Sequence, residues 1–280
     1  VDLAEFIEGL TQEQAVLAFR MLPKGLAAEV FSNLPPEVQQ NIVTSVTDQE
    51  LSEIVEDLFL DDAVDMLEEL PANVVKRVLK QARPETRRLI NQFLQYPENS
   101  VGSIMTAEFV DLKKDTTAGE AIQRIRKVGE DCEAIYTCYV TDSQRVLKGV
   151  ITLRELLLAD ENQPVGENME TDIVTVQTTD DRELAVSQMM HYDFLTLPVV
   201  DRENRLVGVV TVDDAMDVME EEATEDFEKM AAMAPSEKPY LKTGVFTLAK
   251  NRIVWLLVLM LSGMITGGIL GRYEAAFAVM

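Results

Sequence analysis

An internal repeat between residues 101 and 218 limits the fold more than any other feature of this sequence. Each copy predicts a strand, a helix, two further strands and a closing helix. The first helix of a copy is expected from about Ala118 to Val128 and, in the second copy, from about Arg182 to Tyr192. Asp, Asn and Ser residues between the two late strands of each copy are typical of turns. Two similar α+β units are therefore expected in the middle of the chain.

The first hundred residues predict a domain made only of helices. Apolar residues recur at steps of three and four, as in Val16, Phe19 and Leu22. Proline interrupts this pattern repeatedly, and proline begins helices well but is poorly tolerated inside them. Thr11 and Thr47 each stand three residues before a Gln or Glu, which is the pattern of a capping box. We expect short helices joined by tight turns and stacked into a superhelix, whose hand the sequence leaves open.

The charge of the chain excludes one class of partner. It contains 49 acidic and 25 basic residues, which gives a formal net charge of −24. Nucleic acid phosphates would be repelled by such a protein, so we expect no nucleic acid partner. Cations are favoured instead, although acidity also serves solubility.

The sequence offers no recognisable catalytic set. His191 is the single histidine, and Cys132 and Cys138 lack the spacing of a zinc site. No Ser/His/Asp arrangement and no glycine-rich phosphate loop stands out. We therefore expect a protein that is not an enzyme, with free thiols suited to a reducing cytosol.

Residues 213–230 predict an uninterrupted helix with two different faces. Nine acids and no base lie between Asp213 and Glu228. Helical spacing places five acids on one face, namely Asp214, Asp217, Glu221, Glu225 and Glu228. The same spacing places five apolar residues opposite them, namely Met216, Met219, Ala223, Phe227 and Met230. Solvation explains each acid singly, whereas the row of acids favours metal binding.

An uncharged run predicts a transmembrane helix over residues 251–271, with a buried soluble helix as the alternative. The run extends over 18 residues from Ile253 to Leu270. At about 1.5 Å per residue it nearly crosses a hydrocarbon layer of roughly 30 Å. Two overlapping GxxxG steps, at Gly263, Gly267 and Gly271, would allow another helix to approach closely. Basic residues before the run, such as Lys250 and Arg252, indicate that the preceding part lies in the cytosol.

The repeat resembles a tandem pair of CBS domains. The resemblance is carried by Gly149-Val-Ile-Thr-Leu-Arg-Glu155 and Gly208-Val-Val-Thr-Val-Asp-Asp214. In that family a cleft between the copies often holds an adenine nucleotide, and a Gly-x-x-Thr-x-x-Asp step binds its ribose. The second copy keeps the acid as Asp214, whereas the first has Glu155, whose carboxylate can still accept a ribose hydroxyl. Phe194 is a candidate for stacking on a base, with core packing as the alternative, and Arg154 is a candidate for binding phosphates.

The order of the segments resembles the MgtE family of magnesium transporters over the whole chain. The match is strongest from Gly208 to Asp226 and at Asn251-Arg-Ile-Val-Trp-Leu256, and Phe194 with Leu197–Asp201 also fits. The resemblance implies a homodimer in the bacterial inner membrane, with residues 1–250 in the cytosol. It also implies four further membrane helices and an ion-selective pore, which this sequence lacks. Because residue 1 is Val instead of Met, we expect a piece of a longer protein.

The expected fold is that of a multidomain protein. It has an all-α superhelical N-terminal domain, an α+β tandem CBS pair, a long connecting helix and a transmembrane helix. The expected boundaries are 1–100 for the helical domain, 101–162 and 163–218 for the CBS domains, 219–250 for the connecting (plug) helix with its linker, and 251–271 for the membrane helix.

The resemblance further implies a set of carboxylate ligands for Mg²⁺. They are Asp61, Asp65, Glu183, Asp193, Asp214, Asp217, Glu222, Glu225 and Asp226. The helical domain contributes Asp61 and Asp65, the second CBS copy contributes Glu183 and Asp193, and the remaining acids follow on the predicted acidic helix.

The physical expectation is that two anionic surfaces repel each other until a divalent cation joins them. Two unit charges 4 Å apart cost about 4 kcal/mol at an effective dielectric of 20, and salt reduces this cost. Mg²⁺ prefers six oxygens and keeps several waters. An ion that bridges only close surfaces favours the closed state, so we expect high Mg²⁺ to close the pore. The alternative is a membrane-tethered CBS sensor of adenine nucleotides, with ATP bound at Arg154, Glu155 and Phe194. Selectivity for Mg²⁺ over Mn²⁺ or Ca²⁺ rests on the resemblance alone.

Overall fold

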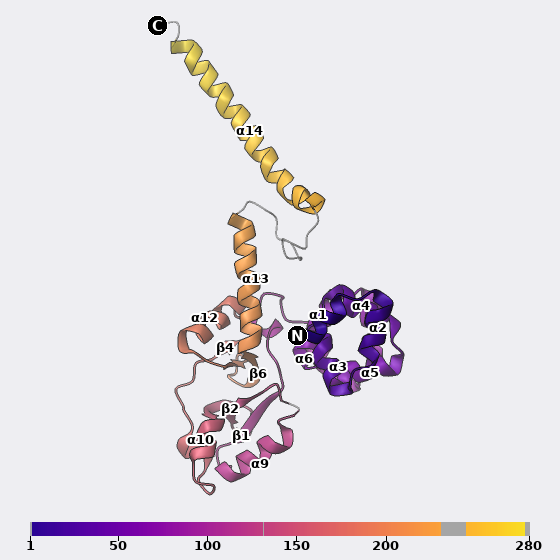
Figure 1. The fold of residues 1–280 in the computed structure, drawn as a ribbon. Coiled ribbons are helices and arrows are strands. Elements are labelled where there is room, and N and C mark those ends of the chain that lie inside the picture. The colour runs from indigo at the N-terminus through magenta and orange to yellow at the C-terminus, as the bar shows by residue number, and fades with distance from the viewer. Residues whose placement is uncertain (1, 131, 231–244, 278–280) are drawn as a thin grey trace. The chain divides into compact units, whose positions relative to one another are not determined.

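The computed structural model describes residues 2–130, 132–230 and 245–277, and the chain divides into two compact units, Val1–Ala215 and Met216–Met280. The first unit begins with a row of short helices (Figure 1). They are α1 (Asp2–Glu8), α2 (Gln12–Arg20), α3 (Lys24–Ser32), α4 (Pro36–Ser45), α5 (Asp48–Asp57), α6 (Leu60–Glu69), α7 (Ala72–Gln81) and α8 (Pro84–Phe93).

The helices α1 to α8 form the superhelix that the sequence predicts. Most of them pack on the helix two positions further along, as α3 does on α5 and α6 does on α8, and the row curls into a ring (Figure 1). Proline starts α4 and α8, where its missing N–H costs nothing. Both predicted capping boxes are present, and the backbone N–H of Thr47 donates to Glu50 over 2.7 Å. Buried apolar residues such as Phe31, Ile42 and Leu51 fill the domain core.

The rest of the first unit holds two three-stranded sheets, with strand orders β1-β2-β3 and β4-β5-β6. The first copy contains the short 3-10 helix η1 (Val101–Ser103), β1 (Phe109–Lys113), α9 (Ala118–Val128), β2 (Ala134–Thr141), β3 (Leu147–Thr152) and α10 (Leu153–Leu158). The second contains α11 (Val165–Asn168), β4 (Val176–Gln177), α12 (Arg182–Tyr192), β5 (Thr196–Val200) and β6 (Leu206–Thr211). In each sheet the first pair of strands is parallel and the second is antiparallel.

One predicted strand is shorter than the sequence indicates. Residues Ile173-Val-Thr-Val176 stand where the repeat predicts the first strand of the second copy, but only Val176 and Gln177 pair with β5. The preceding backbone is engaged elsewhere, because Glu170 and Val150 of the first copy exchange hydrogen bonds of 2.8 and 2.9 Å. The apolar side chain of Ile173 packs between the two copies instead of in a ladder.

The two copies are locked together by a crossed pair of contacts. The segment before each copy's first strand pairs with the last strand of the other copy, through Thr106 with Val209 and Glu170 with Val150. A Cβ on Gly208 would lie 2.7 Å from the sulfur of Met105 and 2.8 Å from the Thr106 carbonyl oxygen. Gly149 is crowded in the same way by Met169. Glycine at these two positions therefore lets the segment from the other copy approach the strand closely.

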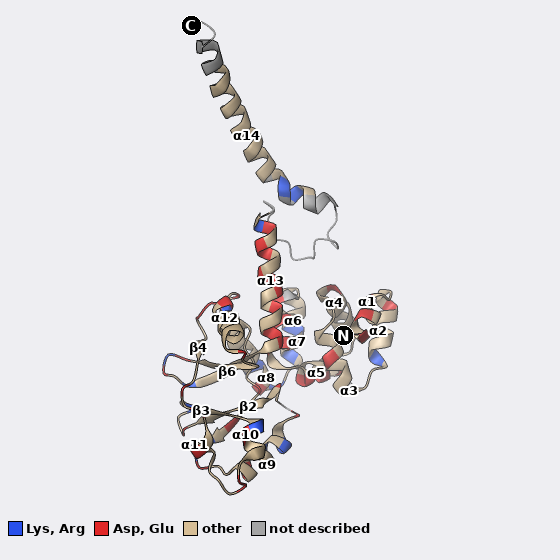
Figure 2. Cartoon of the chain, turned by 60° about the vertical axis from the view of Figure 1, so that its left-hand side comes forward, with Lys and Arg blue, Asp and Glu red and all other residues tan. Residues whose placement is uncertain are grey.

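Helix α13 (Val212–Met230) continues directly from β6, as the acidic sequence predicts. Asp and Glu follow it along its length (Figure 2). All five apolar residues predicted on its other face, from Met216 to Met230, are exposed in the described structure.

Helix α14 (Val245–Phe277) includes the predicted helix over residues 251–271. None of the helices in the described part of the chain combines the length and apolar character that a membrane crossing requires. The assignment of this segment to a membrane stays a prediction.

Candidate metal centre

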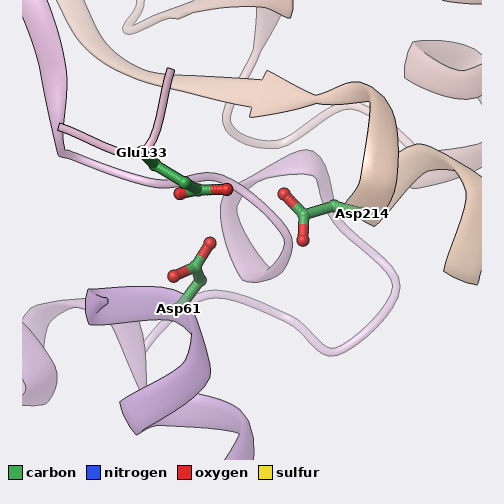
Figure 3. Close-up of side chains that lie close together, drawn as sticks. All are labelled: Asp61, Glu133 and Asp214. Carbon is green, nitrogen blue, oxygen red and sulfur yellow. The ribbon is translucent and has the colours of Figure 1, made fainter. Parts of the chain in front are cut away.

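Three carboxylates from distant parts of the first unit converge at one point (Figure 3). Asp61 lies in the first turn of α6, Glu133 in the loop before β2, and Asp214 in the first turn of α13. One carboxylate oxygen of each residue lies within 4.8 Å of the other two. No other group of three or more potential metal ligands this close occurs among the described residues. These three residues are called the carboxylate cluster below.

Local structure places each member of the cluster. Helix α6 begins after the extended residues Leu58 and Phe59, so Asp61 stands where the helix dipole favours an anion. Strand β6 ends at Thr211, whose hydroxyl donates to Asp214 at the start of α13. The backbone N–H of Glu133 donates to the carbonyl oxygen of Glu108 over 3.1 Å.

Burial and like charge raise the pKa of every member of the cluster. Burial and the charge of Glu133 hold the pKa of Asp61 well above its ordinary value. Burial and Asp61 raise the pKa of Asp214 to about 8, and burial and Asp214 raise that of Glu133 to about 7. The polar side chains of Thr106 and Asp61 beside Glu133, and the hydrogen bond from Thr211 to Asp214, lower these pKa values in part. Near neutral pH the closed cluster therefore needs either protons or a cation.

The cluster fits a hard divalent cation. Oxygen Oε2 of Glu133 is buried without a hydrogen-bond partner, which is costly for a carboxylate. Carboxylate oxygens are the ligands preferred by Mg²⁺, Ca²⁺ and Mn²⁺. Two ligands on opposite sides of such an ion lie about 4 to 5 Å apart, which agrees with the observed separation of up to 4.8 Å. Asp61, Glu133 and Asp214 would hold the ion, and the ion would cancel their repulsion.

The structure brings two predicted ligands together and leaves two predicted acids of the second CBS copy outside the cluster. Asp61 and Asp214 meet, and Asp65 is exposed on α6 while its charge still raises the pKa of Asp214. Glu183 is exposed in the first turn of α12. Asp193 ends α12 in the left-handed conformation, with φ of 57°, and is also exposed.

The predicted ligands Asp217, Glu222, Glu225 and Asp226 lie on the part of α13 that belongs to the second unit. Glu225 forms an ion pair of 2.7 Å with Lys229. The pKa of Lys229 is raised by Glu225, and further by Asp226 and Glu222, so one base already balances part of this charge. Their role as a second ligand group stays a prediction.

Sequence reasoning missed Glu133. It lies in a loop, where side chains follow no helical or strand period that would predict a shared face. The signal that was available is the local concentration of three acids within four residues, Glu130, Asp131 and Glu133.

A second candidate site is a cavity of about 850 Å³ between the two CBS copies. Its lining includes Tyr136 and Arg154 from the first copy and Asp193, Phe194 and Pro198 from the second. A cavity of this size can hold a nucleotide-sized ligand. Two of the residues predicted to bind a nucleotide, Arg154 and Phe194, therefore border one space.

The aromatic ring of Phe194 is partly exposed and stacks on Tyr192, with centroids 5.3 Å apart. It is neither a buried core residue nor free of neighbours. Glu155 does not line the cavity, because its side chain closes a capping box at the start of α10. There it accepts the N–H and the hydroxyl of Thr152, each over 2.8 Å.

Fold and site together define a CBS-pair protein whose helical domain meets the pair at a group of carboxylates. The family model for the MgtE intracellular N domain matches residues 1–99, and the CBS domain model matches residues 101–162 and 165–221. A crystal structure of the cytosolic domain of the Mg²⁺ channel MgtE in complex with ATP superimposes with a TM-score of 0.74. It is 39% identical, and the match covers 78% of this chain and 89% of that one. The chain belongs to the MgtE family.

Two curated relatives match almost the whole chain. The magnesium transporter MgtE of Thermus thermophilus is 40% identical over 98% of this chain and 62% of its own length. The magnesium transporter MgtE of Bacillus subtilis is 29% identical over 98% of this chain and 60% of its own length. The chain thus spans about 60% of the length of these relatives. Both are transporters and not enzymes, in agreement with the absence of a catalytic set from the sequence.

Proposed function

We propose that this chain is the cation-sensing part of a bacterial magnesium transporter. In this proposal Mg²⁺ bound by Asp61, Glu133 and Asp214 holds the helical domain against the CBS pair. The observation that carries it is the carboxylate cluster itself, which joins three elements and has raised pKa values throughout. The magnesium transporters that match nearly the whole chain support the choice of ion.

The three acids favour opposite states with and without the ion. Without it, burial and mutual repulsion oppose docking, and the separated carboxylates can be hydrated. With it, each oxygen that faces the cluster gains a cationic partner only while the surfaces are docked. The ion therefore binds the docked state more tightly, which is the condition for a shift of population.

The wider parts of the proposal concern the whole transporter. Docking of the helical domain would be passed along α13 to close the pore of the transporter. Asp65, Glu183, Asp193, Asp217, Glu222, Glu225 and Asp226 would add weaker, water-mediated sites. The chain would act as a homodimer in the inner membrane, with residues 1–250 in the cytosol.

A titration of protease resistance tests the proposal directly. Millimolar Mg²⁺ should slow cleavage of the parent chain, and Asp61→Asn with Asp214→Asn should abolish that response. Glu85→Gln is the matched control, because Glu85 is also a first-turn helical acid but is exposed. A parent chain whose cleavage rate ignores Mg²⁺ would refute the proposed sensor.

The cavity between the copies favours a second candidate function, the binding of an adenine nucleotide. It contains Arg154 for phosphate and Phe194 for the base, and the related MgtE cytosolic domain was crystallised with ATP. Phe194→Ala should weaken ATP binding measured by calorimetry without moving the Mg²⁺ response. If ATP protects the chain from protease and Mg²⁺ does not, the nucleotide sensor is the better description.

A further inference from the structure

Helix α6, which carries Asp61, receives its N-terminal cap from another domain. Its own N-cap residue is Phe59, which has no side chain able to accept a hydrogen bond. The first free helical N–H, that of Leu60, donates to Oε2 of Glu108 over 3.2 Å. Glu108 stands 48 residues further along the chain, just before strand β1 of the first CBS copy. The N–H of Leu60 therefore has this partner only while the two domains are docked, whereas the N–H of Asp62 donates to Oδ1 of Asp61 within the helix over 2.9 Å.

Glu108 also contacts the second member of the carboxylate cluster. Its carbonyl oxygen accepts the backbone N–H of Glu133 over 3.1 Å. The same residue thus uses its side chain next to Asp61 and its main chain next to Glu133. Two of the three ligand-bearing segments are fixed to one residue.

The third member is reached through Thr106. The Thr106 hydroxyl donates to Oε2 of Glu108 over 2.7 Å. The backbone of Thr106 exchanges hydrogen bonds of 2.8 and 2.9 Å with Val209 in β6, the strand that leads into Asp214. Residues 106–108 therefore contact α6, the loop that carries Glu133 and the strand that leads into α13.

Glu108 is an unusual residue for such a position, because a carboxylate is expensive to remove from water. It is partly buried, and burial raises its pKa, while the hydrogen bonds from Thr106 and Leu60 lower it. Its Oε2 accepts from two neutral donors, and Glu108 is not one of the three clustered ligands.

We propose that Glu108 is the positioning residue of the cation site, capping α6 across the domain boundary and fixing Asp61 relative to Glu133. This inference rests on the proposed function, namely that the carboxylate cluster binds a divalent cation. Glu108 acts through hydrogen-bond geometry instead of charge, so its oxygen must reach Leu60 but need not be ionised. Cap formation and cation binding then favour the same docked state and strengthen each other.

Two substitutions separate geometry from charge. Glu108→Gln keeps an acceptor oxygen at the same reach and removes the charge, whereas Glu108→Asp keeps the charge and shortens the reach. The Mg²⁺ concentration that gives half-maximal protease protection is measured on the full chain. We expect Glu108→Asp to raise this midpoint about three- to tenfold, as the loss of a helix cap would, and Glu108→Gln to stay close to the parent.

Glu56 supplies a matched control inside the helical domain. It accepts the N–H of Arg83, the N-cap of α8, over 2.6 Å and the Thr86 hydroxyl over 2.9 Å. It therefore caps a helix from a distant part of the sequence, as Glu108 does, but away from the cluster. Glu56→Asp should lower the urea midpoint of unfolding and leave the Mg²⁺ midpoint unchanged.

The outcomes distinguish the positioning role from its alternatives. If Glu108→Gln impairs the Mg²⁺ response and Glu108→Asp does not, Glu108 acts through its charge and the inference is wrong. If neither variant moves the Mg²⁺ midpoint, the inference is wrong while the proposed sensor stands. If the parent itself shows no Mg²⁺-dependent protection, the proposed function fails, and the inference falls with it.

Discussion

Asp61 is only 6% exposed, and it faces two other acids. Carboxylates are rarely buried without a partner of opposite charge. The described surroundings of the cluster supply the Thr211 hydroxyl to Asp214 and the backbone N–H of Asp62 to Asp61, and these only partly offset the repulsion. At the scale of single residues, the three ionised carboxylates therefore repel one another until a cation or protons neutralise them.

The first prediction is a pH dependence of stability in the absence of divalent ions. The folded pKa of Asp214 is about 8, against an ordinary value of 3.8. The folded state therefore binds the extra proton between these values, and stability is present at low pH and lost as pH rises from about 4 to 8. The loss approaches about 1.4 kcal/mol per pH unit for one such group. Urea unfolding in EDTA at several pH values measures it, and a midpoint that rises across this window would contradict the burial of the cluster.

The second prediction concerns Glu133, the ligand that periodicity did not reveal. Glu133→Gln removes one of three like charges, so the chain in EDTA should gain about 1 kcal/mol or more in unfolding free energy. The same change should raise the Mg²⁺ midpoint at least about tenfold, because losing one charged partner of a buried pair costs about 2–5 kcal/mol. Glu130→Gln, in the same loop but exposed, is the control and should change neither quantity. The prediction requires that Glu133→Gln stabilises the chain in EDTA and weakens its response to Mg²⁺.

At the scale of elements, the sequence predicts those helices and strands that have a regular apolar period. It does not predict segments whose conformation depends on contacts with distant parts of the chain. Helices α9 and α12 begin and end at the residues that the repeat indicates, because their apolar period and caps act locally. The strand expected over Ile173–Val176 is mostly lost to contacts with the other copy, which no local pattern encodes. Of the cluster, Asp61 and Asp214 followed from the family resemblance, whereas Glu133 depends on a loop whose path is set by tertiary packing.

The third prediction compares two glycines in regular elements. Gly208→Ala should lower the unfolding free energy by about 1–3 kcal/mol, because its Cβ would meet the Thr106 carbonyl at 2.8 Å and Met105 at 2.7 Å. Gly25→Ala in α3 meets nothing within 4 Å and should stabilise by about 0.4–1 kcal/mol. Chemical denaturation measures both. Equal effects of the two substitutions would argue against the crossed packing at β6.

At the scale of the whole molecule, the first unit joins a helical ring to a CBS pair, and the carboxylate cluster lies where they meet (Figures 1 and 3). The like charges of the cluster oppose contact between the helical ring and the CBS pair. This contact should therefore respond more strongly to divalent ions than any other part of the first unit. Interiors such as the core around Ile125 and Ile151 in the first copy carry no such charge.

The fourth prediction follows for hydrogen exchange. Mg²⁺ should slow amide exchange in the first turn of α6 and around Glu133, because opening of the boundary exposes these N–H groups to water. Exchange in the buried part of β2 near Val140 should change much less. Mass spectrometry of peptides from the full chain resolves the two regions. Uniform slowing throughout the first unit would mean that Mg²⁺ stabilises the fold as a whole.

The crossed packing of Met105 on Gly208 and Met169 on Gly149 has a consequence for any attempt to divide the pair. The segment before the first strand of each copy packs on a glycine in the last strand of the other copy. A chain cut after one copy would therefore lose one of these segments and leave the backbone of one strand unpaired. A graft that replaces one half with the corresponding half of another protein must bring the matching lead-in segment with it, or both halves will be incomplete.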